Sequence, residues 1–355
     1  MIPYFFLLLS VCFIENLKKK FKNYRIFNFS LSLAIFLSLS LFAGLRASQV
    51  GTDTNGYLNS FFYYNSNSLN EVFTSQSTVE IGYRILQYFL KLLTNKDYVF
   101  LTFMSAFVLF FQLRAIRLLS KNNLVSIFVF ICFGIYTFSF NGLRQGIAAA
   151  VFMFSFYFIL NKKFYHFLAL IIFGSLFHKS ILVVIPFYFL FLKKFNSKLI
   201  FVLLLGSIIL SLGISRMLLF SSILNDRYAT YIDFTSSGGF NLSFFYILTS
   251  IFFVFYRKFI QKSLIAEYDV FLNSYLLGSI IFCVVVFTGT YIEITRVSFY
   301  FTITQLFLWP LLLKSTHTRY LPVLKLSMII LGIIYFYFIL SEIGGLIPYY
   351  ISKEI

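Results

Sequence analysis

The sequence predicts an all-α, polytopic integral membrane protein with about 12 transmembrane helices. Hydrophobic residues make up 60% of the 355 residues, charged residues make up only 12%, and the mean hydropathy is +0.88. A soluble domain of this length needs more polar surface to cover its core. Apolar segments recur along the whole chain with short polar breaks between them. A single transmembrane domain over residues 1–355 is therefore expected, which leaves no room for a soluble catalytic domain.

The formal net charge of +17 is best explained by membrane topology. Lys and Arg gather in short clusters beside apolar spans, as the positive-inside rule requires, so we expect no nucleic-acid partner. Cys12, Cys132 and Cys283 all lie within apolar spans and lack the spacing of metal ligands. The sequence therefore indicates neither a disulfide framework nor a metal or cofactor site.

The orientation follows from the basic cluster at residues 18–25, which is assigned to the cytoplasm. The span at residues 2–14 then runs inward from an external N-terminus, and the span at 26–44 returns outward. The first span is expected to be a retained helix, because no small-residue cleavage site follows it. Residues 46–96 contain no convincing span and are predicted to form the first outward loop.

Within this loop, residues 83–93 are predicted to form an interfacial helix on the periplasmic or extracellular side. Apolar residues recur there at helical spacing, but Arg84, Gln87 and Lys91 are interleaved with them. The segment is also too short to cross a bilayer. If it did cross, the basic cluster at residues 114–121 would lie outside, against the positive-inside rule.

The remaining spans then alternate across the membrane. Basic clusters follow the inward spans, residues 221–241 form a second outward loop, and both termini are expected to be extracytoplasmic. Several spans are short, so tilted, broken or partly re-entrant helices are expected. The predicted spans are 98–118, 124–140, 146–160, 164–177, 181–192, 199–220, 242–256, 270–288, 297–313 and 321–340.

A set of basic residues faces outward, where the positive-inside rule does not explain it. Any one of them can be an Arg at a helix end that reaches the headgroups. Ionisable groups at membrane depth are costly, however, so several together, accompanied by outward carboxylates, indicate a substrate pathway. The basic residues are Arg46, Arg84, Arg144, His178, Lys179, Arg227 and Arg296, and the carboxylates are Asp53, Glu80, Asp226, Asp233 and Glu293.

Arg144 and Gln145 stand at the start of an inward helix, after Asn141-Gly142. Unpaired backbone N–H groups at a helix N-terminus favour an anion, whereas a cation is disfavoured there. This conflict predicts an anionic partner shared by Arg144 and the helix end. The alternative is a structural Arg that pairs with a neighbouring carboxylate.

His178 interrupts an apolar run and is predicted to lie in a tight outward turn. Imidazole groups titrate near neutral pH, so His178 could act as a base, an acid or a pyrophosphate ligand, or could be purely structural. Asp53 lies in a polar turn that composition alone explains as a loop. Glu80 opens the interfacial helix, which helix capping explains equally well. The outward Tyr57 could stack on a sugar ring.

These motifs, in their order along the chain, resemble those of the EpsG family of Wzy-type polysaccharide polymerases, which serve exopolysaccharide, capsule and O-antigen synthesis. Each motif alone is weak, but the ordered set is specific and extends from about residue 46 to residue 349. The motifs are Arg46…Gly51-Thr52-Asp53-Thr54…Tyr57, Glu80-x-Gly82-Tyr83, Asn141-x-x-Arg144-Gln145-Gly146, Phe177-His178-Lys179-Ser180 and Arg296-x-x-x-Tyr300.

The resemblance implies a glycosyltransferase-type enzyme in the bacterial cytoplasmic (inner) membrane. Such an enzyme moves a growing glycan from polyprenyl pyrophosphate onto the next lipid-linked repeat unit at the outer membrane face. Its expected partners are undecaprenyl-pyrophosphate-linked oligosaccharides and the lipid bilayer, with a flippase and a chain-length regulator in the same system.

From this chemistry we hypothesise that Arg144 and Arg296 bind the pyrophosphate, since Arg binds phosphate bidentately. His178 would orient or protonate the leaving side, and Asp53 or Glu80 would assist the acceptor hydroxyl. Further substrate contacts are expected from Arg46, Arg227, Gln145, Lys179 and Tyr57.

Three other functions stay open at this point. A lipid-linked glycan flippase or other transporter would also need basic residues, but at midplane depth, whereas the span centres here are almost free of charge. A membrane acyltransferase would also use a His in apolar surroundings. A purely structural scaffold would leave the outward Arg residues without a purpose.

Overall fold

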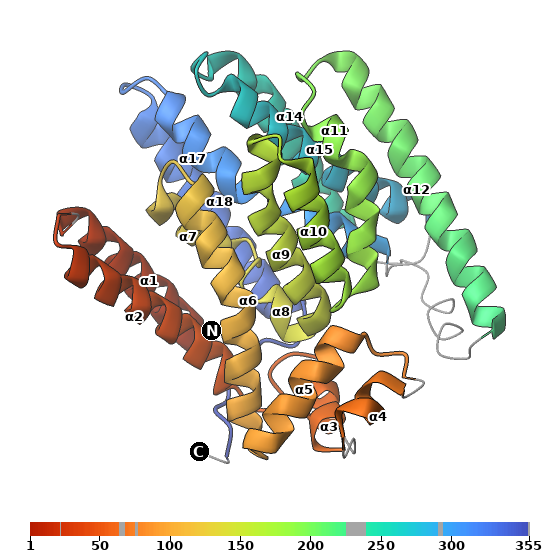
Figure 1. Cartoon of the computed structure of the whole chain (residues 1–355). Coiled ribbons are helices and arrows are strands. Elements are labelled where there is room, and N and C mark those ends of the chain that lie inside the picture. The colour runs from red at the N-terminus through yellow and green to blue at the C-terminus, as the bar shows by residue number, and fades with distance from the viewer. Residues whose placement is uncertain (22, 64–67, 75–76, 225–238, 290–293, 354–355) are drawn as a thin grey trace. The chain divides into compact units, whose positions relative to one another are not determined.

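The computed structural model describes residues 1–21, 23–63, 68–74, 77–224, 239–289 and 294–353, which form helices and no strand (Figure 1). Contacts divide the chain into two compact units. Unit 1 comprises Met1–Val183 and Thr318–Ile355, and unit 2 comprises Val184–His317. The prediction of an all-helical chain is confirmed for the described part.

Seven helices in the described residues are long and apolar enough to cross a membrane, which confirms a polytopic membrane protein. The predicted number of about 12 spans is not supported. The seven are α2 (Arg25–Gly44), α6 (Asp97–Leu119), α9 (Leu143–Leu160), α14 with the short η2 (Phe240–Phe259), α15 (Ile265–Thr288), α16 with α17 (Thr295–Ser315) and α18 (Leu321–Glu342).

The other predicted spans coincide with helices that are shorter or interrupted. α7 ends at Cys132, eight residues before the predicted boundary at residue 140, because Gly134 adopts φ +72° and turns the chain towards the short α8 (Phe138–Asn141). The predicted span at 181–192 is a 3₁₀ segment, η1, that contains Pro186 and continues into α11. The short helices are α7 (Asn123–Cys132), α10 (Phe164–Ser175), η1 (Lys179–Phe187) and α11 (Tyr188–Phe191). α1 runs over Ile2–Lys20 and carries Glu15 and three Lys residues in its last turns, and α12 runs over Ser197–Leu224.

Unit 1 is built around α6 and α9, which pack against each other along their lengths. α2 and α10 cover α6 and α9 respectively, and α1 and α18 both contact α7. The centre of α9 carries the run Ala148-Ala149-Ala150, which is buried throughout. Small side chains of this kind let neighbouring helices approach closely in a membrane protein.

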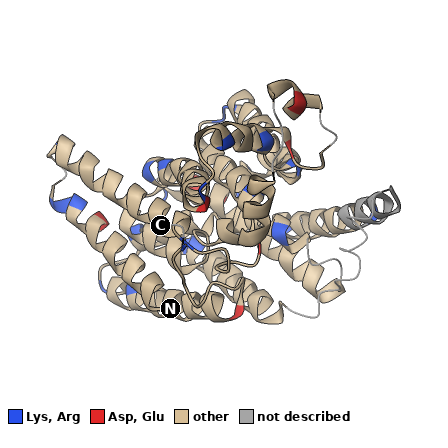
Figure 2. Cartoon of the chain, turned by 90° about the horizontal axis from the view of Figure 1, so that it is seen from below, with Lys and Arg blue, Asp and Glu red and all other residues tan. Residues whose placement is uncertain are grey.

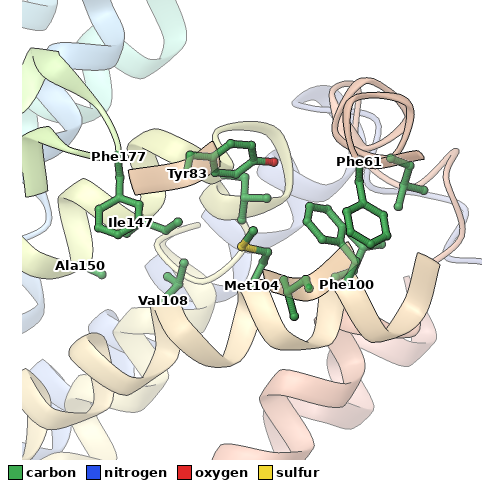
Figure 3. Packing of buried hydrophobic residues seen from close by; sticks show 12 residues of the cluster. Phe61, Tyr83, Phe100, Met104, Val108, Ile147, Ala150 and Phe177 are labelled. Carbon is green, nitrogen blue, oxygen red and sulfur yellow. The ribbon is translucent and has the colours of Figure 1, made fainter. Parts of the chain in front are cut away.

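Three helices connect α2 to α6: α3 (Thr54–Phe62), α4 (Leu69–Thr74) and α5 (Ile81–Leu93). α4 packs on α5. An apolar cluster joins α3 and α5 to α6, with Phe61 stacked on Phe100 and with Tyr83 beside Met104 (Figure 3). Residues 83–93 therefore form a helix, as predicted.

α5 buries part of its polar face in the protein. Its polar residues Arg84 and Gln87 are buried, and Gln87 donates a hydrogen bond to Ser60 (3.1 Å). Phe89, Leu92 and Leu93 are exposed instead. Exposed apolar residues on a short helix suit contact with the lipid interface.

The segment after α18 closes the same end of unit 1. The Tyr349 hydroxyl donates to the carbonyl of Phe42 at the end of α2 (2.6 Å), and the Ser352 hydroxyl donates to Asp97 at the start of α6 (2.6 Å). The N–H of Gly51 donates to the carbonyl of Gly345 (2.9 Å). The C-terminal segment thus holds the ends of helices that are far apart in sequence.

Unit 2 is organised around α15, which contacts α11, α12, α14, α16 and α17. Near its start, Asp269 accepts two hydrogen bonds from Arg257 (2.6 and 2.7 Å) and one from the backbone N–H of Phe195 (3.2 Å). One turn later, the Asn273 side chain donates to the carbonyl of Lys193 (2.7 Å). These polar contacts connect the α11–α12 turn to α15.

Candidate active site

Glu80 is the centre of a polar cluster in unit 1. One carboxylate oxygen accepts a hydrogen bond from the guanidinium of Arg144. The other lies 3.1 Å from Nδ1 of His178 and 3.4 Å from the backbone nitrogen of Lys179. Arg144 and His178 follow Glu80 by 64 and 98 residues in the sequence, and both meet its carboxylate in the fold.

A close approach between α5 and the end of α10 brings Glu80 to His178. The N–H of Gly82 donates to the carbonyl of Leu176 at 2.8 Å. A Cβ on Gly82 would lie 2.8 Å from that same oxygen, so only glycine fits there without displacing backbone. Glu80 precedes Gly82 by two residues and His178 follows Leu176 by two, so this contact places the two side chains together.

Arg144 is positioned by the tight turn between α8 and α9. α9 begins at Leu143, three residues earlier than predicted, so Arg144 belongs to the first helical turn. The N–H of Leu143 donates to the hydroxyl of Tyr57 (2.9 Å), and that hydroxyl donates to the carbonyl of Asn141 (3.2 Å). Tyr57 thus occupies one of the N–H groups that was expected to be available for an anion.

An apolar layer supports the three side chains. α5 contributes Tyr83, α9 contributes Leu143 and Ile147, and the α10–η1 turn contributes Phe177. In Figure 3, Tyr83, Ile147 and Phe177 lie over Met104 and Val108 of α6. Each segment that supplies a polar side chain to the cluster is therefore anchored in the same buried core, which restricts how the polar groups can move.

Charge within the cluster keeps Glu80 ionised. Burial by itself would raise the pKa of the Glu80 carboxyl, but the hydrogen bond with His178 and the charge of Arg144 outweigh it and lower the pKa from 4.5 to about 2. An ionised carboxylate can only accept hydrogen bonds, so Nδ1 of His178 carries the proton in this contact. In the neutral form of the ring, Nε2 is then unprotonated.

The cluster is also partly accessible. The side chains of Arg144 and His178 are 21% and 29% exposed, whereas Glu80 is only 9% exposed. A ligand could reach the guanidinium and the imidazole without displacing the carboxylate. No group of three or more His, Cys, Asp or Glu side chains that could hold a metal ion occurs in the described part of the chain.

Comparison with protein families identifies the group to which the chain belongs. Residues 29–351, nearly the whole chain, match the EpsG family. The chain belongs to the EpsG family. EpsG proteins are Wzy-like polysaccharide polymerases, so the assignment carries a glycosyltransferase-like polymerase role at a general level. No curated protein and no solved structure matched the chain in the corresponding searches.

The motif that begins at Arg46 lies in a supporting position in unit 1. Arg46 is 1% exposed, donates to the Thr54 hydroxyl (3.3 Å) and to the carbonyl of Ala43, and lies over the ring of Phe140 at 4.3 Å. Burial lowers the pKa of Arg46 to about 10, so it remains a cation at neutral pH. These contacts hold the loop beyond α2, and the predicted substrate contact of Arg46 stays a prediction.

Asp53 and Glu80 both precede helices, but neither side chain caps its helix. Asp53 accepts a hydrogen bond from Thr52 (3.2 Å), and no contact places it in the Glu80 cluster among the described residues. Glu80 directs its carboxylate to Arg144 and His178 instead. Capping therefore does not explain Glu80.

The other predicted site residues have separate positions. Gln145 is buried in α9, and the Lys179 side chain is exposed at the start of η1. Arg296 is an exposed residue of α16 in unit 2, so its predicted convergence with Arg144 stays a prediction. Arg227 lies outside the described residues, as do Asp226, Asp233 and Glu293.

Asn141 makes contacts that could not be predicted from the sequence. Its side-chain amide donates to the carbonyl of Gly344 (2.8 Å), and its own carbonyl accepts from Tyr57 (3.2 Å). Asn141 thus joins α3, the α8–α9 turn and the segment after α18. In the sequence Asn141 stands in the Asn141-x-x-Arg144 motif and before Gly142, and that position by itself predicts no more than a turn.

Proposed function

We propose that this EpsG-family protein polymerises lipid-linked glycans at the outer face of the bacterial cytoplasmic membrane. In this proposal the donor is a growing glycan on polyprenyl pyrophosphate, and the acceptor is a lipid-linked oligosaccharide repeat unit. Family membership supports the polymerase class. The shared Glu80 carboxylate, which holds Arg144 and His178 side by side, is the observation that supports the finer chemistry.

Arg144 is proposed to bind the pyrophosphate of the donor. A guanidinium has five N–H donors, and the bond to Glu80 leaves others for phosphate oxygens. Negative charge develops on the leaving pyrophosphate as its bond to the sugar breaks. A cation that is already held in position stabilises that charge without reorganising.

His178 is proposed to act as the general base. Glu80 holds the proton on Nδ1, so Nε2 can accept a proton from the acceptor sugar hydroxyl. The hydroxyl oxygen then bonds to the anomeric carbon of the donor sugar. The bond from that carbon to the phosphate oxygen breaks, and polyprenyl pyrophosphate leaves with the electron pair.

Glu80 is proposed to position both groups rather than to take the proton itself. A carboxylate with a pKa of about 2 is a weak base near neutral pH, and both of its oxygens already accept hydrogen bonds. Its function in this scheme resembles that of the carboxylate that orients His in hydrolase triads. This role replaces the sequence-based suggestion that Glu80 assists the acceptor hydroxyl directly.

The position of the cluster suits substrates that are anchored in the membrane. It lies beside α5, whose exposed Phe89, Leu92 and Leu93 suit the lipid interface. A polyprenyl chain can stay in the bilayer while its pyrophosphate reaches Arg144. Such lateral access needs no water-filled channel through the bundle.

The test is extension of a defined lipid-linked repeat unit by the purified protein in lipid vesicles, with products resolved by length. We expect Arg144→Ala to reduce the polymerisation rate by about 100-fold or more, and His178→Ala to do likewise. Lys163→Ala is the matched control, because this exposed residue lies in the α9–α10 turn at the other end of α9. Wild-type chain lengths from a well-folded Arg144→Ala protein would remove Arg144 from the site.

A further inference from the structure

A groove lies at the end of unit 1 opposite the Glu80 cluster, between α2 and α6. A cavity of about 240 Å³ is lined by Phe29, Leu33 and Phe36 of α2 and by Phe110 and Leu113 of α6. Arg114 and Arg117 of α6 line the same cavity. In Figure 1 this is the end where α1 and α2 connect, away from α3 and α5.

The groove has an elongated apolar part. Phe29, Leu33 and Phe36 are spaced i, i+4, i+7 and so follow one face of α2. Phe110 and Leu113 follow the facing side of α6. At 1.5 Å per residue, the stretch from Phe29 to Phe36 covers about 10 Å, which matches part of one acyl chain lying along the helices.

The end of the groove is cationic and polar. Two further hollows adjoin it and share Ser32 and Arg117 with it; one adds Arg25 and Asn28, and the other adds Lys18 and Asn123. Lys18 pairs with Glu15 at 2.8 Å. Within the described ranges, no Asp or Glu forms an ion pair with Arg114 or Arg117.

Glu15 lines the hollow beside Lys18, but Arg114 and Arg117 themselves form no ion pair with a described carboxylate, unlike the basic site in unit 2. There Arg257 is held by Asp269 through two hydrogen bonds of 2.6 and 2.7 Å. Basic residues outnumber acidic ones over the whole chain, 29 to 12, and Figure 2 shows the acidic residues scattered singly. The charge at the groove therefore calls for an anion from outside the chain.

We infer that this groove binds one anionic phospholipid. The phosphodiester lies against Arg114 and Arg117, which sit one helical turn apart, and an acyl chain lies between Phe29, Leu33 and Phe110. Basic pockets between transmembrane helices bind anionic headgroups in this way. The bound lipid fills the space between α2 and α6 and so stabilises the α1–α2 pair against the bundle.

The site is separate from the proposed polymerase chemistry. Met104, which packs near Tyr83 beneath the Glu80 cluster, and Arg117 are 13 residues apart on α6, which corresponds to about 20 Å along the helix. Lipid binding at the groove therefore needs no contact with the glycan substrates.

The test uses the full-length protein in a neutral detergent, with phosphatidylglycerol or phosphatidylcholine titrated in and bound lipid counted by native mass spectrometry. We expect one tightly bound phosphatidylglycerol and no equally tight phosphatidylcholine. Arg114→Gln with Arg117→Gln should weaken that lipid on the order of 30-fold. Lys162→Gln with Lys163→Gln, which removes the same charge from an exposed turn outside the groove, should leave it unchanged.

A second variant distinguishes a defined lipid-binding site from non-specific attraction of anionic lipid to positive charge. Leu33→Trp keeps every cation but fills the apolar part of the groove, and we expect it to weaken the lipid while leaving the thermal unfolding of lipid-free protein near that of wild type. Equal losses in the two double variants, or full binding by Leu33→Trp, would overturn the proposal. Tight binding of glycerol phosphate alone would show that the site binds phosphate without an acyl chain, which would also overturn the proposal. Displacement of phosphatidylglycerol by polyprenyl phosphate at an equal concentration would assign the groove to the carrier lipid instead.

Discussion

At the scale of single residues, Glu80 determines the geometry of the candidate site. Its two oxygens receive Arg144 on one side and His178 with the Lys179 N–H on the other. Removal of either partner leaves a buried carboxylate with less compensation, which costs more than the contact itself provides. Glu80 therefore affects both the stability of unit 1 and the orientation of the groups proposed to act on substrate.

The low pKa of Glu80 predicts a pH-dependent effect of Glu80→Gln. The carboxyl titrates near 4.5 when unfolded and at about 2 when folded, so its stabilisation is present above pH 4.5 and is lost as the pH falls towards 2. At pH 7 the variant should lose on the order of 3 kcal/mol. Thermal unfolding in detergent at pH 7 and pH 3 measures this, and the difference from wild type should shrink at pH 3.

Glu342→Gln is the control for that measurement. Glu342 is an exposed carboxylate at the end of α18, so its loss should change stability by less than about 0.5 kcal/mol at either pH. A Glu80→Gln deficit that stays the same from pH 7 to pH 3 would contradict an ionised, stabilising carboxylate.

At the scale of elements, the contact between α5 and the end of α10 decides whether the cluster forms. Gly82 and the carbonyl of Leu176 approach so closely that any side chain on Gly82 meets backbone. Backbone atoms cannot turn aside as a flexible side chain can. α5 would have to move away, and Glu80 would move with it.

We therefore expect Gly82→Ala to impair polymerisation by about tenfold or more and to destabilise unit 1 by about 1–3 kcal/mol. A loss of stability is informative here, because Ala is intrinsically a better helix former than Gly by about 1 kcal/mol. Gly56→Ala in α3 is the matched control, since a Cβ there meets nothing within 4 Å. It should be neutral or slightly stabilising, and a Gly82→Ala protein that matches it in both assays would refute the proposed role of this contact.

At the scale of the whole molecule, the seven long apolar helices of the described residues and the distribution of basic residues together predict a membrane orientation that can be measured. The positive-inside rule assigns the α1–α2 turn, the end of α6 and the α9–α10 turn to the cytoplasm. The α3–α5 segment and the Glu80 cluster then face outward, which is the side where the proposed polymerisation takes place.

Single cysteines test this orientation in a background with Cys12, Cys132 and Cys283 replaced by Ala. Asn59→Cys, an exposed position on α3, should react with a membrane-impermeant maleimide in intact spheroplasts. Lys163→Cys in the α9–α10 turn should react only after permeabilisation. The reverse pattern would invert the topology and would place the Glu80 cluster on the cytoplasmic side.

The sequence alone determined the membrane class, the family and most helix positions, because these depend on composition, apolar run length and ordered motifs that can be read locally. It also raised the alternative that Arg144 pairs with a carboxylate, but it could not identify Glu80 as that partner. Only the tertiary structure decided this, since Glu80 and Arg144 are 64 residues apart and meet through the Gly82–Leu176 contact and a shared apolar layer. The tertiary structure also decided which helices are too short to span the membrane. Gly134 turns the chain after α7, and Pro186 lies in a 3₁₀ segment. In both places backbone geometry divides an apolar run that hydropathy alone could not divide.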